Sequence, residues 1–162
     1  SRGPDWRRVF QANIDNEAPP LHLVVDGYGA DTAKLQDEEL VRTFLDEYPD
    51  AIGMTKMIAP QVYTYHGPVA EDWGVSGFVL IAESHISVHT FPERGYINID
   101  IFSCKEFDAE AALRDVEGFF SLPKVRWWTM ERGIDYSSPA QARREVDRER
   151  VQLTPFRGSS DG

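Results

Sequence analysis

The chain has 162 residues, of which 41% are hydrophobic and 27% are charged, a composition typical of one globular domain. Its 27 Asp and Glu residues outnumber its 17 Lys and Arg residues; the formal net charge of -10 argues against nucleic-acid binding and mildly favours a small cationic substrate. No apolar run approaches the ~20 residues of a membrane-spanning helix, so the sequence predicts no membrane association.

The first part of the chain predicts a strand followed by a helix. The apolar run 21–25 is rich in strand formers, and a turn signal at 26–29 closes it. Asp31 or Thr32 is predicted to cap a helix whose apolar residues recur at helical spacing. We expect this helix to end at Pro49, because proline cannot continue the hydrogen-bond ladder.

The middle of the chain has the pattern of successive strands. A loop at 66–74 and a turn at 92–95 interrupt them. The predicted strands cover residues 54–65, 75–82, 86–91 and 96–103.

A second helix is predicted to begin at Asp108 and to run to about Ser121, because its apolar residues recur on one face. A last strand is predicted over 125–130. Side chains alternate between the two faces of a strand, so we expect one of Trp127 and Trp128 in the core and the other on the outer face.

This order of elements predicts an α+β fold, a two-layer α/β sandwich in which two helices cover one face of an antiparallel sheet. We expect one domain over residues 21–136, preceded by a flexible arm at 1–20 and followed by a polar tail at 137–162. Within the tail, 140–150 has the pattern of an exposed helix. The chain begins without an apolar signal region or an initiating methionine, which suggests a fragment or a processed chain.

Polar side chains with catalytic potential gather between Gly74 and Cys104. This stretch holds two histidines, the chain's only cysteine, four serines and the acids Glu83 and Glu93. Buried polar groups need partners, so their number suggests a site, although each residue alone is more often structural.

Several other site types are excluded by the same residues. A single cysteine rules out an internal disulfide and suits the reducing cytoplasm, where we expect the protein. One cysteine and four scattered histidines give no zinc-ligand spacing, so no metal is predicted. The sequence has no phosphate-binding loop, dinucleotide fingerprint or nucleophile elbow.

The string ESHISVHTFPERGY at 83–96 closely resembles the processing segment of the prokaryotic S-adenosylmethionine decarboxylase family. Three further strings are similar to family segments and occur in the same order: HLVVDGYG at 22–29, GVSG at 74–77, and DIFSC ending at Cys104. The resemblance extends from about residue 22 to residue 133 and is far more specific than any single short motif.

The resemblance implies a proenzyme that cleaves itself between Glu83 and Ser84. The Ser84 hydroxyl attacks the preceding carbonyl to form an ester, and elimination and hydrolysis then leave a pyruvoyl group at the start of residues 84–162. The residues matching Ser76 and His89 assist this processing in related enzymes, with His89 moving the proton, since an unactivated hydroxyl is a weak nucleophile.

The resemblance also implies roles in decarboxylation. The pyruvoyl group forms a Schiff base with the substrate amine and serves as the electron sink. The residue matching Cys104 reprotonates the α-carbon, for which a thiol pKa of ~8.5 is suitable. Glu93 matches a carboxylate that binds the ribose hydroxyls, and Phe91 retains an aromatic wall.

One position departs from the family pattern and bears on which substrate the chain would bind. Many relatives carry an adenine-stacking aromatic about six residues before the serine of GVSG, where this chain has Ala70. Either Trp73 replaces that aromatic or the stack is lost. Glu71 and Asp72 are then candidates to face the distal cation of a basic amino acid, although solvated loop acids would look the same.

The favoured function is conversion of S-adenosylmethionine to decarboxylated S-adenosylmethionine and CO2, for spermidine biosynthesis. The first alternative is the same pyruvoyl chemistry on L-ornithine or L-arginine, and the second is an inactive regulatory homologue. A purely structural domain explains none of the polar cluster. We expect a homodimer of cleaved protomers with active sites near the shared interface.

Overall fold

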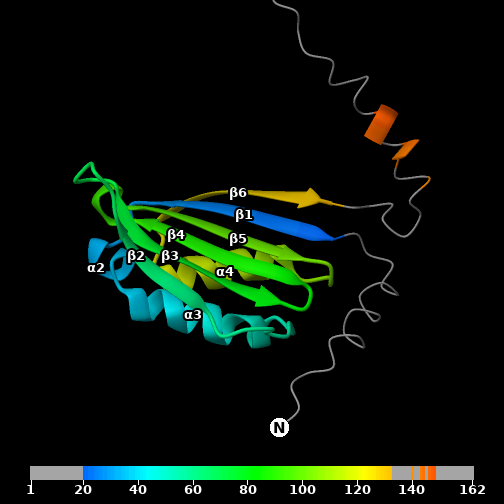
Figure 1. Ribbon diagram of the computed structural model, residues 1–162, viewed down its shortest axis with the longest axis horizontal. Helices are drawn as coiled ribbons and strands as arrows, with labels where there is room; N and C mark the ends of the chain where they lie inside the picture. Colours follow the sequence, from blue (N-terminus) through cyan, green and yellow to red (C-terminus); the bar gives the residue numbers. More distant parts are fainter. Residues whose placement is uncertain (1–19, 133–139, 141–142, 145, 149–162) are drawn as a thin grey trace, which may run out of the picture. The chain divides into compact units, whose positions relative to one another are not determined.

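The computed structural model describes residues 20–132, 140, 143–144 and 146–148. Residues 20–132 belong to one compact unit, in which the helices lie on one face of a six-stranded antiparallel sheet (Figure 1). The predicted α+β sandwich is confirmed. The arm at 1–19 lies outside the described residues. Of the predicted helix at 140–150, the described residues are helical.

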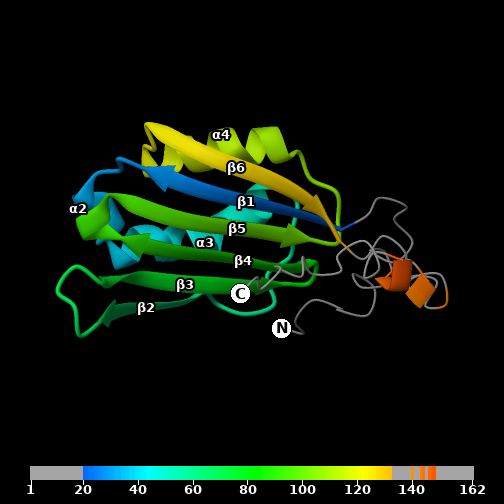
Figure 2. The same ribbon diagram turned by 90° about the horizontal axis from the view of Figure 1, so that it is seen from above.

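The strand order in the sheet is β2-β3-β4-β5-β1-β6 (Figure 2). The first strand is inserted between two later ones, so that Val25 pairs with Ile99 on one side and with Trp127 on the other. The elements are β1 (Leu21–Tyr28), α2 (Thr32–Leu35), α3 (Glu38–Ala51), β2 (Gln61–His66), β3 (Trp73–Ile81), β4 (Ser84–Phe91), the 3-10 turn η1 (Pro92–Arg94), β5 (Tyr96–Ser103), α4 (Ala109–Phe120) and β6 (Lys124–Glu131).

The core lies between the sheet and the two long helices. Alternate residues of β5, such as Ile99, are fully buried on the helix side, and α3 and α4 contribute Phe44 and Phe120 to the same cluster. We call the other side of the sheet, which α2, α3 and α4 leave uncovered (Figure 1), the open face. Because side chains alternate along a strand, every strand that buries apolar residues inside presents its remaining side chains on the open face.

The first strand is longer than its sequence predicts. Asp26 was expected in a turn, but β1 continues through Tyr28, and the left-handed backbone is confined to Gly29. Asp26 pairs with Asn98 on β5 and with Arg126 on β6, and pairing on both sides outweighs the local turn preference.

The predicted helix is divided into two. Asp31 caps only the short α2, and the main helix begins after Asp37, whose side chain accepts a hydrogen bond from the backbone N–H of Leu40. The expectation that this helix ends at Pro49 was wrong, since α3 continues to Ala51. Burial of Pro49 against the core stabilises a last turn that has lost one hydrogen bond.

Two predictions about strands were also wrong. Of the strand predicted over 54–65, only β2 forms, beginning at Gln61. Trp127 and Trp128 are 43% and 42% exposed, so neither enters the core. Both lie on β6, an edge strand, where neighbouring side chains cover only one side of each residue. No helix in the described part of the chain has the length and apolar character needed to cross a bilayer.

Gly74 and Gly118 provide a matched test of the packing. A Cβ at Gly74 would lie 1.8 Å from the carbonyl oxygen of Thr90, whereas one at Gly118 meets nothing within 4 Å. Gly74→Ala should therefore lower the free energy of unfolding by about 3 kcal/mol or more. Gly118→Ala, in the interior of α4, should raise it by about 0.5–1 kcal/mol. Urea unfolding measures both, and equal effects would contradict the packing described.

Candidate active site

The turn between β3 and β4 contains the candidate cleavage bond. Only Ala82 and Glu83 separate the paired residues Ile81 and Ser84. The φ of Ser84 is 155°, a value that residues with a side chain rarely adopt and that costs about 1–3 kcal/mol. Backbone strain is therefore concentrated on the residue that follows the Glu83–Ser84 peptide bond.

Hydrogen bonds hold this turn from two sides. Glu83 is only 2% exposed, and its carboxylate accepts a hydrogen bond from the backbone N–H of Thr55 at 3.1 Å. The Glu83 carbonyl accepts one from the N–H of Cys104 at 2.8 Å, and the N–H of Ala82 donates to the Thr55 carbonyl at 2.8 Å. Because both sides of the turn are tied to neighbouring segments, the strain at Ser84 cannot relax locally.

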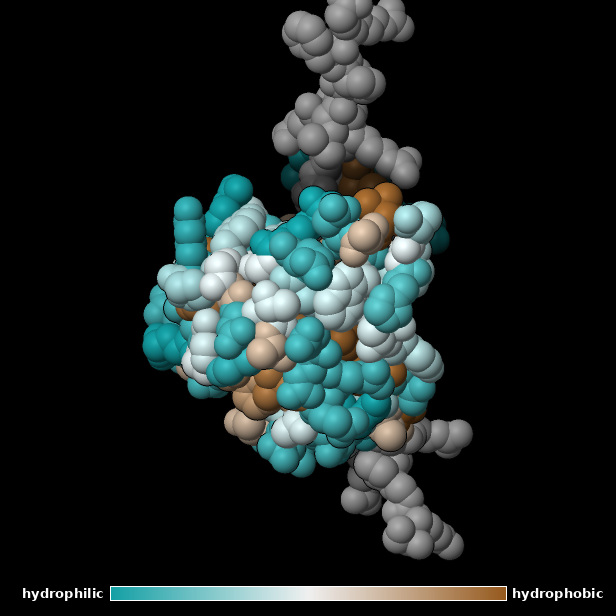
Figure 3. Space-filling model, turned by 90° about the vertical axis from the view of Figure 1, so that its left-hand side faces the viewer, coloured by the Kyte–Doolittle hydropathy of each residue, from teal (hydrophilic) through white to brown (hydrophobic). Residues whose placement is uncertain are grey.

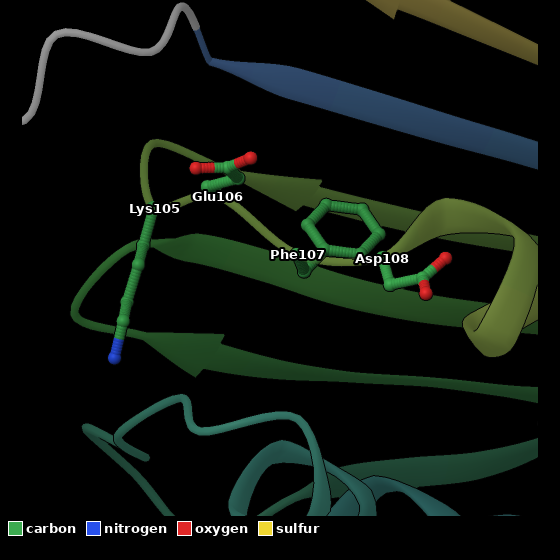
Figure 4. Close-up of a pocket in the computed structure, with 4 residues that line it drawn as sticks. All are labelled: Lys105, Glu106, Phe107 and Asp108. Atoms are coloured by element: carbon green, nitrogen blue, oxygen red, sulfur yellow. The ribbon is translucent and has the colours of Figure 1, made fainter.

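Ser84 and Cys104 lie together although 20 residues separate them. The Ser84 Oγ is 3.6 Å from the Cys104 Sγ, because Ser84 pairs with Ser103 at the end of β5. The half-buried thiol precedes a loop that lines an open pocket of about 640 Å³ (Figure 4). In this loop Lys105 points away from the other labelled side chains (Figure 4) and donates a hydrogen bond to the Gly53 carbonyl at 2.9 Å.

A histidine with a lowered pKa follows the candidate cleavage serine in the chain. The ring of His85 packs against Phe102 with centroids 5.6 Å apart and lies 6.4 Å from the ring of His22, which is bonded to Asp100 at 2.8 Å. Burial lowers the pKa of His85, the neighbouring His22 lowers it further, and Asp100 acts in the opposite direction. His85 is therefore uncharged at neutral pH.

A second pair of candidate residues lies on the open face. The Ser76 Oγ is 2.8 Å from the His89 Nδ1, because the register of β3 against β4 places the two residues opposite each other. This hydroxyl–imidazole contact is the geometry in which a histidine can move a proton. The sequence suggested both residues but could not show that they touch.

A cavity of about 120 Å³ lies next to this pair. The Trp73 indole N–H donates to the Glu93 carboxylate at 3.2 Å, and the indole stacks on the His66 ring with centroids 5.6 Å apart. The cavity is lined by Tyr65, Asp72, Trp73, Gly74, Ser76, Thr90 and Phe91.

Tyr65 and His66 were not predicted as site residues, because the sequence placed Tyr65 at the end of a strand and His66 at the start of a loop. Their only signal was the alternation along β2. That alternation cannot show that Tyr65 pairs with Gly74 at the cavity.

Both acidic residues of the β2–β3 loop are exposed. Asp72 forms an ion pair with Arg94 at 2.7 Å, while Glu71 and Ala70 are exposed. The end of the sandwich that carries α2 and this loop is covered mainly by hydrophilic residues (Figure 3). Among the described residues, no three or more His, Cys, Asp or Glu side chains come together as a metal site would require.

The candidate residues thus form two separate groups. Ser84 and His89 lie at opposite parts of the same strand, five residues apart, which corresponds to about 16 Å at the rise of a β-strand. A direct proton transfer needs the two atoms within about 3 Å. Within one copy of the chain, His89 therefore cannot act on Ser84.

The fold and this arrangement define an α+β sandwich with a strained hairpin serine beside a thiol, and comparison with known proteins gives its family. The profile of the S-adenosylmethionine decarboxylase family matches residues 21–133. An S-adenosylmethionine decarboxylase proenzyme of Archaeoglobus fulgidus is 36% identical over 113 residues, covering 69% of this chain and 96% of the relative. One from Clostridium botulinum (strain Langeland) is 38% identical over 113 residues, 69% of this chain and 92% of the relative.

A solved structure agrees with the sequence comparisons. The crystal structure of the adenosylmethionine decarboxylase from Aquifex aeolicus VF5 is similar with a TM-score of 0.62 and 29% sequence identity, over 74% of this chain and 94% of that one. The chain belongs to the S-adenosylmethionine decarboxylase family, and the resemblance noted in its sequence is confirmed.

The carboxylate of Glu83 provides a test of the clamp on the turn. Glu83→Ala would leave the buried N–H of Thr55 without its partner, and the free energy of unfolding should fall by about 1–3 kcal/mol. Glu83→Gln keeps an acceptor oxygen and should lose less. Both are measured by urea unfolding in a Ser84→Ala background, which removes the hydroxyl proposed for cleavage. Equal losses for the two variants would show that the hydrogen bond contributes nothing.

Proposed function

We propose that this chain is a self-processing, pyruvoyl-dependent decarboxylase that converts S-adenosylmethionine to its decarboxylated form and CO2, with Ser84 as the precursor of the pyruvoyl group. The observation that carries the proposal is the contact between Ser84 and Cys104 at a strained hairpin. One residue offers a hydroxyl next to the peptide bond to be cut, and the other offers a thiol within reach of the group formed there.

The proposed cleavage uses only the chain and water. The Ser84 Oγ attacks the Glu83 carbonyl carbon, and the peptide C–N bond breaks as the ester C–O bond forms and a proton moves to the nitrogen. Elimination then takes the α-proton of residue 84 and breaks the ester, leaving Glu83 with a free carboxylate. Water hydrolyses the resulting enamine with release of ammonia, and residue 84 becomes a pyruvoyl group. Strain at Ser84 favours the first step, because forming the ester removes the constrained peptide.

The residues around Ser84 fit such a group. A pyruvoyl ketone supplies an electron-withdrawing carbonyl that lowers the barrier to loss of CO2. The Cys104 Sγ is 3.6 Å from the Ser84 Oγ, close enough for the thiol to act as the proposed proton donor to the substrate α-carbon.

The choice of S-adenosylmethionine is supported by two observations. The matches to two relatives extend over 96% and 92% of those relatives' own length, and both relatives are named S-adenosylmethionine decarboxylase proenzymes. The cavity wall also combines the aromatic Trp73 and Phe91 with the carboxylate of Glu93 nearby, a suitable combination for a nucleoside. Asp72, the candidate partner of a basic amino acid, is already paired with Arg94, which weakens the ornithine and arginine alternatives.

Intact-mass spectrometry beside a Ser84→Ala control tests the cleavage. We expect two fragments, 1–83 and 84–162, the second with a blocked N-terminus, and an uncut chain for Ser84→Ala. Release of labelled CO2 from S-adenosylmethionine, L-ornithine and L-arginine then identifies the substrate. A chain that stays whole in both samples would favour an inactive homologue. Cleavage followed by release of CO2 from ornithine or arginine alone would support the pyruvoyl chemistry and show that S-adenosylmethionine is not the substrate.

The separation of the two groups supports a homodimer in which each active site uses both copies. If His89 moves a proton during cleavage, it must approach the Ser84 of a second copy, since its own Ser84 is about 16 Å away along the strand. The open face offers a surface for this association, because an uncovered sheet face commonly stacks on another sheet. Its exposed large apolar side chains are Tyr63, Tyr65, Phe78, Leu80, Trp128 and Met130.

Co-expression of two defective chains with different tags tests the shared site. Ser84→Ala lacks the cleavage serine but retains His89, and His89→Gln has the opposite defect. We expect His89→Gln chains to cleave when co-expressed with Ser84→Ala but not alone, and not with the double variant Ser84→Ala/His89→Gln as the matched control. Cleavage that is equally absent with either partner would contradict a site shared between copies.

A further inference from the structure

A row of polar side chains crosses the open face through His89. The register of four neighbouring strands aligns Ser76 of β3 with His89 of β4, His89 with Asn98 of β5, and Asn98 with Asp26 of β1. Residues directly opposite in an antiparallel pair have Cβ atoms about 4.5–5.5 Å apart. Ser76 and Asp26 are thus the ends of one continuous polar row with an imidazole and an amide between them.

The orientation of the Asn98 amide is determined by its partners. Its Nδ2 donates to the Asp26 Oδ1 at 3.0 Å and to the Tyr96 hydroxyl at 2.6 Å. An ionised carboxylate can only accept hydrogen bonds, so the nitrogen end of the amide must face Asp26. Burial raises the pKa of Tyr96, and a hydrogen bond to Asp26 raises it further, so the phenol stays protonated.

The oxygen end of the amide is therefore left for the other neighbouring strand. Asn98 lies between β1 and β4, and its nitrogen is committed on the β1 side. Its Oδ1 accepts no hydrogen bond from the described residues, and His89 is the register partner of Asn98 on the β4 side. The His89 Nδ1 is already in contact with the Ser76 Oγ, so Nε2 is the ring atom left to donate to Asn98.

We infer that Asp26 and Asn98 are positioning residues that hold the proton of neutral His89 on Nε2. Asp26 orients the amide, the amide oxygen accepts the Nε2–H, and the Nδ1 lone pair faces the Ser76 hydroxyl. The proton of that hydroxyl can then pass from Oγ to Nδ1, while the positive charge formed on the ring is stabilised by the amide dipole and, behind it, by the carboxylate of Asp26.

The hydrogen-bond arrangement does not depend on the proposed function, but its role in self-cleavage does, because that role requires His89 to move the proton. Both parts can be tested on the full chain. Nitrogen-15 NMR of the histidine rings distinguishes the two neutral tautomers, and replacing each histidine in turn by glutamine assigns the four signals. Ser84→Ala, which lacks the cleavage serine, serves as the parent.

Three variants in the Ser84→Ala background separate positioning from a merely structural role. Asn98→Leu removes the acceptor, and the Nε2–H tautomer of His89 should no longer predominate. Asn98→Asp keeps an oxygen opposite His89, so it should keep that tautomer and raise the His89 pKa. Asp100→Asn is the matched control, since Asp100 is hydrogen-bonded to His22. This variant should change the signals of His22 and leave the tautomer of His89 unchanged.

Several titratable groups share the open face around His89. They are His85 on its own strand, Tyr96 and Asp100 on β5, Asp26 and Tyr28 on β1, Arg126 on β6 and Tyr63 on β2. The rise in the pKa of His89 expected for Asn98→Asp is therefore read as the difference from the parent, in which all of these groups are present.

The cleavage rate of the otherwise unmodified chain completes the test. Asn98→Leu and Asp26→Asn should slow self-cleavage by about 10- to 100-fold, the loss typical of removing a partner that orients a functional histidine, and Asp100→Asn should leave the rate unchanged. A parent with its proton on Nδ1, or an unchanged tautomer in Asn98→Leu, overturns the inference. A changed tautomer with an unchanged cleavage rate supports the positioning and overturns the role of His89 in cleavage.

Discussion

The register of β4 against its two neighbours is the constraint on which the candidate site depends. The register of β4 against β5 places Ser84 beside Ser103, and the Ser84 Oγ therefore lies 3.6 Å from the Sγ of the next residue, Cys104. Against β3 it places His89 opposite Ser76. Because side chains alternate along a strand, a slip of one residue would turn each of these groups to the other face. The buried residues of β4, among them Ile86 and Val88, prevent the slip, since it would expose them.

The two ends of β4 have different physical properties. At Ser84 the backbone is strained and tied down by Glu83, whose carboxylate and carbonyl are both hydrogen-bonded. Near His89 the strand is regular, and the side chain is exposed on the open face. A self-cleaving protein needs both a peptide bond under constraint and a mobile proton. In this chain the residues proposed for these two roles, Ser84 and His89, lie about 16 Å apart along the strand, which makes assembly part of the proposed chemistry rather than an addition to it.

Covering one face of the sheet by helices leaves the other face for polar and aromatic residues. Apolar residues are used on the helix side, as Leu23, Ile97 and Ile101 show. The open face therefore combines hydrogen-bonded groups, such as Asp26 with Asn98, with exposed aromatic side chains. A surface of that composition can support both association and proton transfer, and the same strands supply both.

Patterns in the sequence were enough to predict most of the elements of this protein and its candidate site residues. Alternating and helical periodicities predicted the α+β sandwich, and the motif residues Ser84, His89 and Cys104 were identified from short strings that are contiguous in the chain. Local propensity failed at Asp26 and at Pro49, where pairing on both sides and core packing outweighed it. The folded chain was needed to show that Ser84 contacts Cys104 while His89 lies far from both, that Asn98 pairs with His89, and that His85 has a lowered pKa. The physical reason is that register, burial and electrostatic neighbours depend on contacts between strands distant in the sequence, which no local pattern encodes.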